Sequence, residues 1–174
     1  MPNHVINELI FRDVDKIAQA LILNRLCDAE GKVDFQILVP VPLNIWWGNA
    51  GQRHEQAFKR TRLDWASENW GTKWNAYDQA PIEATADTLT LRFQTAWSPP
   101  YPWLAAVFNG LKCSFEHNWM SEGDDAGRCG VFDVAQAGEL LGDPWQQREA
   151  DEAMQRHLHL LLWGVEAFED EDAG

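Results

Sequence analysis

The clearest element in the sequence is the stretch Leu89-Thr90-Leu91-Arg92-Phe93-Gln94-Thr95-Ala96-Trp97. Every second side chain, from Leu89 to Trp97, is apolar or β-branched, and polar Thr90, Arg92 and Gln94 stand between them. Successive side chains of a strand point to opposite faces of the sheet. The alternation therefore predicts a strand over 89–97, with Trp97 among its core residues.

The residues after this strand predict a helix and a hairpin. The proline-rich segment 98–102 leads into apolar side chains at helical spacing over 103–108, and Gly110 stands where a helix commonly ends. The stretches 113–120 and 128–135 then predict two strands that pair antiparallel through the turn-forming segment 121–127.

The N-terminal part predicts another strand, helix and strand. Residues 5–11 are apolar on both faces, which predicts a strand buried on both sides. Asp13 is the expected N-cap of a helix that Gly31 closes. Phe35, Ile37 and Val39 predict a short strand that the following prolines end.

The remaining segments predict an insertion and a terminal helix. Regular patterning weakens over 43–87, so we expect an insertion there, with one helix over 52–67. The capping signals at 143–146 predict a helix that continues to about Leu162. Residues 169–174 are expected to form an acidic tail after a single domain over 1–168.

This element order favours an α+β fold. A split β-α-β pattern with an added hairpin is typical of a ferredoxin-like open antiparallel sheet with helices on one face. The inserted segment is Trp-rich, and a C-terminal helix completes the expected architecture.

Composition bounds the class of protein. No run of about 20 uncharged apolar residues is present, so no membrane span is expected. The first residues lack the pattern of a secretory signal, and three cysteines without a close pair fit neither a disulfide framework nor a zinc site. We therefore expect a cytoplasmic protein without metal or other cofactor.

The net charge of −13 is unevenly distributed. Residues 1–112 contain 12 acidic and 11 basic side chains, whereas residues 113–174 contain 15 acidic and 3 basic ones. An acidic portion of this kind repels nucleic acid, so a nucleic-acid partner is not expected. Its ordinary interpretation is a solvated surface, and an alternative is a protein that imitates DNA and occupies a DNA-binding partner.

Ten tryptophans in 174 residues require either core packing or recognition. Trp97, Trp103 and Trp163 fall on apolar faces of predicted elements and are expected in the core. Four others lie in the insertion, where no periodic pattern assigns them to a core, and are expected at the surface: Trp46, Trp47, Trp70 and Trp74.

Several segments resemble the YubB-like family, which plasmids, phages and bacterial genomes carry and for which no reaction is established. They are 69–76 (Asn-Trp-Gly-Thr-Lys-Trp-Asn-Ala), the opening Met1-Pro2-Asn3 with Asn7, the stretch 35–42 ending in Pro-x-Pro, and the junction 93–100. The resemblance covers roughly residues 1–135 and implies a ferredoxin-like domain. It implies no activity.

The segment 69–75 is the candidate ligand-binding site. Its indoles offer flat apolar surfaces, Lys73 a cation and Asn69 hydrogen-bonding groups, and Glu122 belongs to the hairpin that resembles the family's. The expected ligand residues are Asn69, Trp70, Lys73, Trp74 and Glu122. The alternative, which stays open, is a structural loop with Trp70 and Trp74 buried.

Catalytic chemistry has weaker support. Carboxylates and a histidine able to exchange protons occur at Asp78, Glu116, His117, Glu122 and Asp124, but their spacing matches no known catalytic motif. His117 shares a strand face with apolar residues and is expected at the edge of the core. His157 and His159 point in different directions on a helix, so a shared metal is not expected.

Three hypotheses about function remain. The first is a non-enzymatic accessory or binding protein of a mobile element or bacterial genome, whose partner is a protein or a small molecule. The second is an enzyme or small-ligand binder that uses Trp70–Trp74, and the third is the DNA mimic.

The basic residues Arg53, Lys59, Arg60 and Arg62 are expected on a solvated helix. The oligomeric state is left open.

Overall fold

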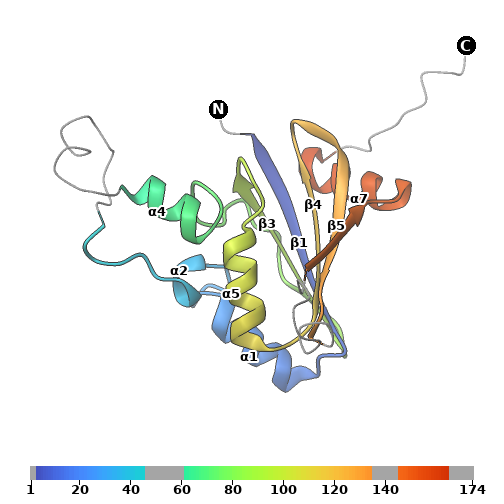
Figure 1. The fold of residues 1–174 in the computed structure, drawn as a ribbon. Coiled ribbons are helices and arrows are strands. Elements are labelled where there is room, and N and C mark those ends of the chain that lie inside the picture. The colour runs from blue at the N-terminus through green and yellow to red at the C-terminus, as the bar shows by residue number, and fades with distance from the viewer. Residues whose placement is uncertain (1–2, 46–60, 135–144, 165–174) are drawn as a thin grey trace, which may run out of the picture.

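The computed structural model describes residues 3–45, 61–134 and 145–164. Figure 1 shows its elements, whose bounds follow in chain order. They are β1 (His4–Arg12), α1 (Lys16–Leu26), α2 (Phe35–Leu38), α4 (Arg62–Asn69), β2 (Glu83–Ala84), β3 (Thr88–Ala96), α5 (Tyr101–Leu111), β4 (Phe115–Ser121), β5 (Asp124–Phe132), β6 (Trp145–Glu149) and α7 (Glu152–Trp163).

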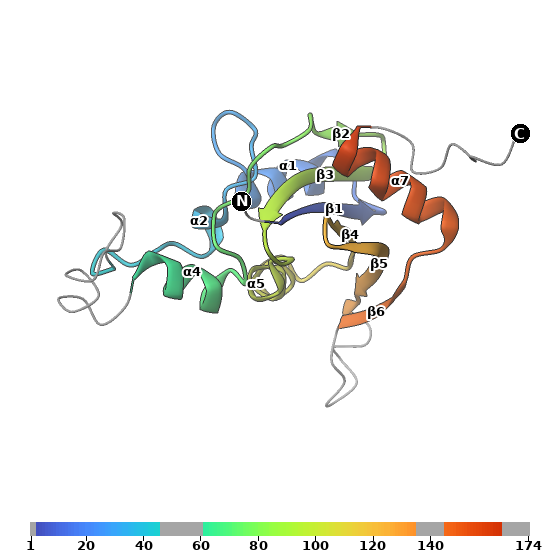
Figure 2. The same cartoon turned by 90° about the horizontal axis from the view of Figure 1, so that it is seen from above.

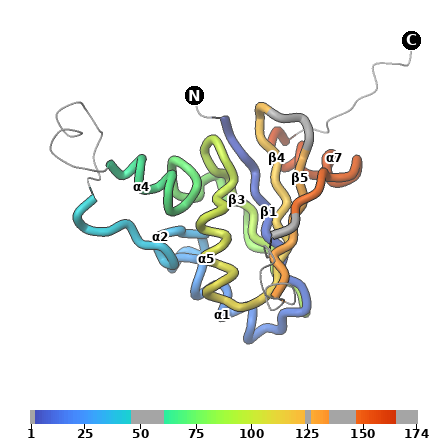
Figure 3. The backbone as a smooth tube through the Cα atoms, in the orientation of Figure 1, coloured from blue at the N-terminus to red at the C-terminus, as the bar shows by residue number. Residues whose placement is uncertain are grey.

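The strands form one six-stranded sheet in the order β2-β3-β1-β4-β5-β6, and every neighbouring pair is antiparallel. β1 lies between β3 and β4 and runs opposite to both, so β3 and β4 are parallel to each other. α5 connects them, and the unit β3-α5-β4 is therefore a split β-α-β motif with β1 inserted in its middle. Figure 3 shows β1 running between these two strands.

The two faces of the sheet carry different helices. Figure 2 shows α1, α2 and α5 on one side of the sheet and α7 on the other. We call the first side the inner face, which bears Leu9, Phe93 and Phe115, and the second the α7 face, which bears Ile6 and Glu8. The helices of the split unit and of the N-terminal segment thus share one face, as predicted, and the C-terminal helix covers the other.

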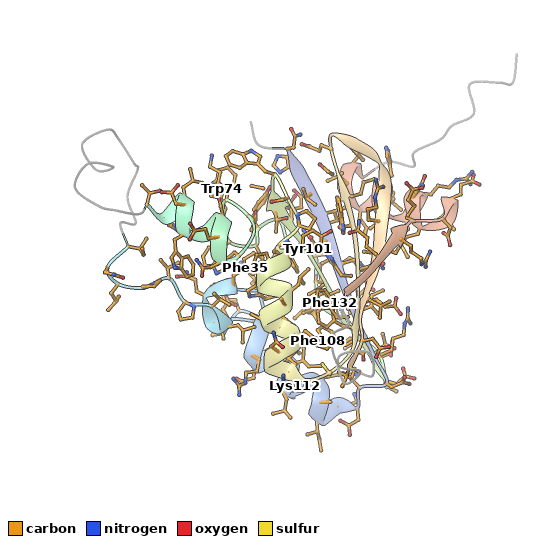
Figure 4. The ribbon with its side chains drawn as sticks, in the orientation of Figure 1. Phe35, Trp74, Tyr101, Phe108, Lys112 and Phe132 are labelled. Carbon is orange, nitrogen blue, oxygen red and sulfur yellow. The ribbon has the colours of Figure 1, made fainter. Side chains whose placement is uncertain are left out.

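The main core lies between the inner face and its helices. Trp103 and Leu104 of α5 are fully buried there, against strand residues such as Phe93. Phe35 lies 4.4 Å from Trp103 and 5.7 Å from Phe93, measured between ring centroids. Phe108 of α5 faces Phe132 of β5 at 5.8 Å, and Figure 4 shows both residues between the helix and the sheet.

A second, smaller cluster lies under α7. Leu158 is fully buried against Ile6 and Met120, and its methyl group closes over Gly127, where an added Cβ would lie 2.9 Å from it. Within the described ranges, no helix has the length and apolar character needed to cross a membrane.

Two predicted elements adopt a different structure. The segment 35–39, predicted as a strand, is the short helix α2, because the Asp34 carboxylate accepts a hydrogen bond from the Gln36 N–H and caps a helical turn. The helix predicted to begin near Asp143 begins at Glu152 instead, with Asp151 as its N-cap. Residues 145–149 are strand β6, which pairs with β5.

Two predicted helix ends also differ. The N-cap of α1 is Asp15, which accepts from Ala18 N–H, whereas Asp13 adopts a left-handed turn with φ 56°. α5 includes Gly110 and ends at Leu111, with Lys112 as its left-handed C-cap at φ 54°. Of the helix predicted over 52–67, residues 62–67 are confirmed as part of α4, which continues to Asn69, and residues 52–60 lie outside the described ranges.

Three tryptophan predictions are wrong. Trp70, expected at the surface, is fully buried, whereas Trp97 and Trp163, expected in the core, are 51% and 37% exposed. Trp97 leaves the core because its backbone turns to φ 76° at the end of β3, which breaks the alternation of the strand. Trp74 is exposed and Trp103 buried, as predicted, while Trp46 and Trp47 lie outside the described residues.

Candidate functional site

The candidate segment 69–75 follows directly from the end of α4. Thr61 and Asp64 form a capping box at the start of this helix. The helix ends at Asn69, and Gly71 takes a left-handed conformation with φ 82°. A Cβ at Gly71 would collide with Pro102 and lie 3.2 Å from the Tyr101 nitrogen, so only glycine lets the segment pass so close to α5.

Much of the segment anchors it to the rest of the fold. The Trp70 indole N–H donates to the Val39 carbonyl at 2.9 Å, and its ring meets Phe35 edge to face. The Asn69 amide donates to the Trp65 carbonyl within α4. Thr72 is buried and exchanges hydrogen bonds with the backbone of Ala96. These contacts stabilise the loop and leave Trp70 inaccessible to a ligand.

Lys73 and Trp74 form the exposed part of the segment, together with a residue from the end of β3. The Lys73 ammonium lies 4.4 Å from the ring centroid of Trp97 and 4.9 Å from that of Trp74. The two indoles are 51% and 41% exposed. We call this group the Trp74–Lys73–Trp97 surface; Figure 4 shows Trp74 at the outer edge of the molecule.

Tyr77, which packs against Trp74, links this surface to the first strand and to β3 through hydrogen bonds. The Trp74 ring meets Tyr77 edge to face at 6.0 Å, and the Tyr77 hydroxyl lies 2.8 Å from His4 Nδ1 and 3.1 Å from the Thr95 carbonyl. Glu122 accepts from the His4 backbone N–H at 2.8 Å. Burial, with Glu122 and Asp78 adding to it, raises the pKa of Tyr77 to about 12, so the phenol stays protonated.

The structure thus separates the five predicted ligand residues. Lys73 and Trp74 share one surface, and Trp70 points into the core. Asn69 bonds back to its own helix, and Glu122 holds the first strand by its backbone. Sequence reasoning missed Trp97, the second indole over Lys73. Its only signal is the Ser-Pro-Pro run that follows it, which ends the strand at this point.

The candidate catalytic residues are not gathered in one place. His117 is fully buried on the inner face, and burial lowers its pKa to about 3. Its Nε2 lies 3.0 Å from Asn7 Oδ1, and because the Asn7 amide nitrogen donates to Val5 and Thr95, this oxygen accepts from Nε2–H. Glu116 points to the opposite face and forms an ion pair with Arg12.

Glu8 is a charged residue that sequence reasoning did not single out. It is 1% exposed on the α7 face, where it accepts from Arg92 at 2.7 Å, from Asn118 at 3.1 Å and from His157 of α7 at 2.9 Å. Burial alone would raise its pKa, but the hydrogen bonds from His157, Arg92 and Asn118 outweigh it and lower the pKa to about 2. The carboxylate is therefore charged and fixes α7 to the sheet.

The two histidines of α7 differ as predicted. His157 contacts Glu8, whereas the His159 ring lies against Trp163 at 4.3 Å. Within the described ranges, no group of three or more His, Cys, Asp or Glu side chains has the arrangement of a metal site. Arg53, Lys59 and Arg60, like the Asp124 side chain, lie outside what the structure describes.

The antiparallel sheet with its split β-α-β unit defines an α+β protein with a ferredoxin-like domain. Residues 69–161 match the family described as the ferredoxin-like domain in Api92-like protein, and the chain belongs to this family. The match includes the candidate segment, β6 and nearly all of α7. No curated protein and no solved structure matches the chain. The family description gives a fold and no reaction.

Proposed function

We propose that this protein is a non-catalytic accessory protein that binds a protein partner through the Trp74–Lys73–Trp97 surface. The observation that carries the proposal is the Lys73 ammonium between two half-exposed indoles. Exposed tryptophans bury large areas on association and are enriched among the residues that dominate binding energy.

The shape of the surface favours a macromolecular partner over a small ligand. Trp70, which would have formed the wall of a deep site, is buried in the core. The remaining indoles stand on the outside, where a partner can cover them together with the aliphatic stem of Lys73. The ammonium between them offers a charge-assisted hydrogen bond to a carboxylate of the partner.

The resemblance of four segments to the YubB-like family supports a cytoplasmic origin in a bacterium or its plasmids and phages. In that setting an accessory protein acts by binding a host or element protein. A small-ligand or enzymatic use of the same surface is the alternative, and it requires a ligand that stacks on Trp74 and contacts Lys73.

Site-specific photo-crosslinking in a bacterial host tests the proposal. A photoreactive amino acid replaces Trp97, and the same replacement at Leu21 of α1, which is 62% exposed, serves as the matched control. We expect a discrete protein adduct from position 97 that position 21 does not give. The adduct should disappear when Trp74→Ala is added, and the purified partner should bind the wild-type chain but not Trp74→Ala.

The contrary results are specific. Identical adducts from positions 97 and 21, or an adduct that survives Trp74→Ala unchanged, would show that the surface does not select a partner. If purified chain with Trp97→Ala and Trp74→Ala binds the partner as tightly as the wild type, the proposal is wrong.

A further inference from the structure

A pocket of about 330 Å³ opens on the α7 face of the sheet, across β4, β5 and β6. Its lining includes Glu116, Asn118, Cys129, Val131 and Arg148. This volume is at the lower end of the range for small-molecule sites. None of the residues of the Trp74–Lys73–Trp97 surface lines it, so the pocket is a separate feature.

Arg148 provides a cation at the pocket. It lies in β6 directly opposite Cys129 of β5 and is exposed. In the part of the chain that the structure describes, no carboxylate lies within ion-pair distance of its guanidinium. A guanidinium without a partner is well suited to bind a carboxylate through two parallel hydrogen bonds.

Asn118 provides an acceptor at the other side of the pocket. The side chain is 2% exposed, and its Nδ2 donates to Glu8, which fixes Oδ1 as the remaining acceptor. No described residue donates a hydrogen bond to this oxygen. Because Asn118 lines the pocket, this oxygen can accept a hydrogen bond from a bound donor. Glu116, whose carboxylate is oriented by Arg12, adds negative charge beside it.

Cys129 and Val131 provide the apolar part of the lining. Cys129 is 5% exposed and Val131 is 43% exposed. Burial raises the pKa of the Cys129 thiol, and Arg148 opposes the shift, so the thiol is neutral and contributes only apolar surface. Glu116 and Arg148, which both line the pocket, carry opposite charges.

We propose that this pocket binds a free amino acid with an apolar side chain. Its carboxylate pairs with Arg148, its ammonium donates to Asn118 Oδ1 and to Glu116, and its side chain lies against Cys129 and Val131. A simple carboxylate offers no donor to Asn118 Oδ1, and a simple amine offers no anion to Arg148. A zwitterion is complementary to both ends of the pocket.

The test is an NMR titration of the ¹⁵N-labelled full chain. Each standard amino acid is added separately up to about 10 mM, a range that detects weak binding. We expect an apolar amino acid such as leucine to produce saturable shifts at the Asn118 side-chain amide and at the backbone amides of Cys129 and Val131. Isovalerate and isobutylamine, which carry only one of the two charged groups, should bind at least about tenfold more weakly.

Two variants locate the binding. Arg148→Gln should weaken leucine binding at least about tenfold, because it removes a charge-assisted pair. Arg25→Gln, which removes an equal charge from the exposed end of α1, should leave binding unchanged. The spectrum of each variant also reports whether it folds.

Three results would overturn the proposal. These are the absence of saturable shifts at the pocket with every amino acid, equal binding by Arg148→Gln and the wild type, or equal affinity for isovalerate and leucine. The last would leave a carboxylate site without amino-acid specificity.

Discussion

Trp70 and Trp74 are four residues apart and end in opposite environments. In a continuous helix they would lie on the same side, but α4 ends at Asn69 and the left-handed turn at Gly71 redirects the chain. The first indole therefore joins Phe35 and Trp65 in the core, and the second joins Lys73 at the surface. The same residue type thus occupies two different environments within one segment.

Replacing each tryptophan by alanine should separate these roles. Trp70→Ala removes a fully buried indole and its hydrogen bond to Val39, so we expect the free energy of unfolding to fall by about 3–5 kcal/mol. Trp74→Ala should lower it by less than about 1 kcal/mol, mainly through the lost contact with Lys73. Urea denaturation of the two variants measures both values. Equal losses would mean that Trp74 also has a structural role.

Gly71→Ala tests the close approach of the segment to α5. The new methyl group would collide with Pro102 at a backbone conformation that alanine disfavours. Gly164→Ala is the matched control, because its φ of 72° is similar and, among the described residues, no atom lies within 4 Å of the added Cβ. We expect about 1 kcal/mol of destabilisation at Gly164 and at least about 2 kcal/mol at Gly71, measured by thermal unfolding. Equal effects would show that the backbone conformation alone matters.

At the residue scale, the sequence predicted Trp74 and Lys73 as surface groups but wrongly placed Trp70 at the surface with them. The insertion has no periodic pattern, and burial of an indole in a loop depends on contacts such as Val39 that come from elsewhere in the chain. The sequence pattern partly indicates the role of Glu8. A carboxylate between Ile6 and Ile10 in a strand buried on both faces requires a partner, and Arg92 stands directly opposite it.

α7 is held to the sheet by an ion pair at its centre. His157 of the helix donates to Glu8, and this hydrogen bond is the main cause that raises the pKa of His157, while burial opposes it. A raised histidine pKa gives stability that is fully present below its unfolded value of 6.5 and is lost as pH rises through the folded value. The lowered pKa of Glu8 gives stability that is present above 4.5 and is lost as pH falls towards 2.

We therefore expect α7 to be most firmly docked between about pH 4.5 and 6.5. Hydrogen exchange of the α7 amides, corrected for the intrinsic pH dependence, should show less protection above this window in the wild type. His157→Gln should remove this loss at high pH, whereas His159→Gln, which changes the outward-facing histidine, should preserve it. A pH profile of protection that His157→Gln leaves unchanged would contradict this role of the ion pair.

The predicted elements failed where two local signals competed. The alternation of Phe35, Ile37 and Val39 predicted a strand, but so short an apolar run also fits a helical turn. The Asp34 cap stabilises the helical turn, which is the structure that forms. The capping signals at Asp143 and Pro144 were misleading, because pairing with β5 makes 145–149 a strand. The long alternating strands β1, β3 and β4 were correctly predicted, since tertiary pairing only reinforces their pattern.

For the molecule as a whole, the two hydrophobic clusters on opposite faces of the sheet should contribute unequally to the stability of the fold. The main core beneath α5 includes no residue of α7, whose own cluster is small. A chain ending at residue 150 should fold and retain the sheet, but with lower stability. Exposure of Ile6 and Met120 should cost roughly 1.5–3 kcal/mol each. Loss of a cooperative urea transition would show instead that α7 is essential to the fold.

The central position of β1 has a consequence for biosynthesis. It leaves the ribosome before either of its neighbours, which follow much later in the chain, over 88–96 and 116–121. During translation its apolar side chains lack these partner strands until β3 and β4 have been made, a period in which aggregation and chaperone capture compete with folding. The nascent chain is therefore expected to acquire its sheet abruptly, once β4 has emerged, rather than strand by strand.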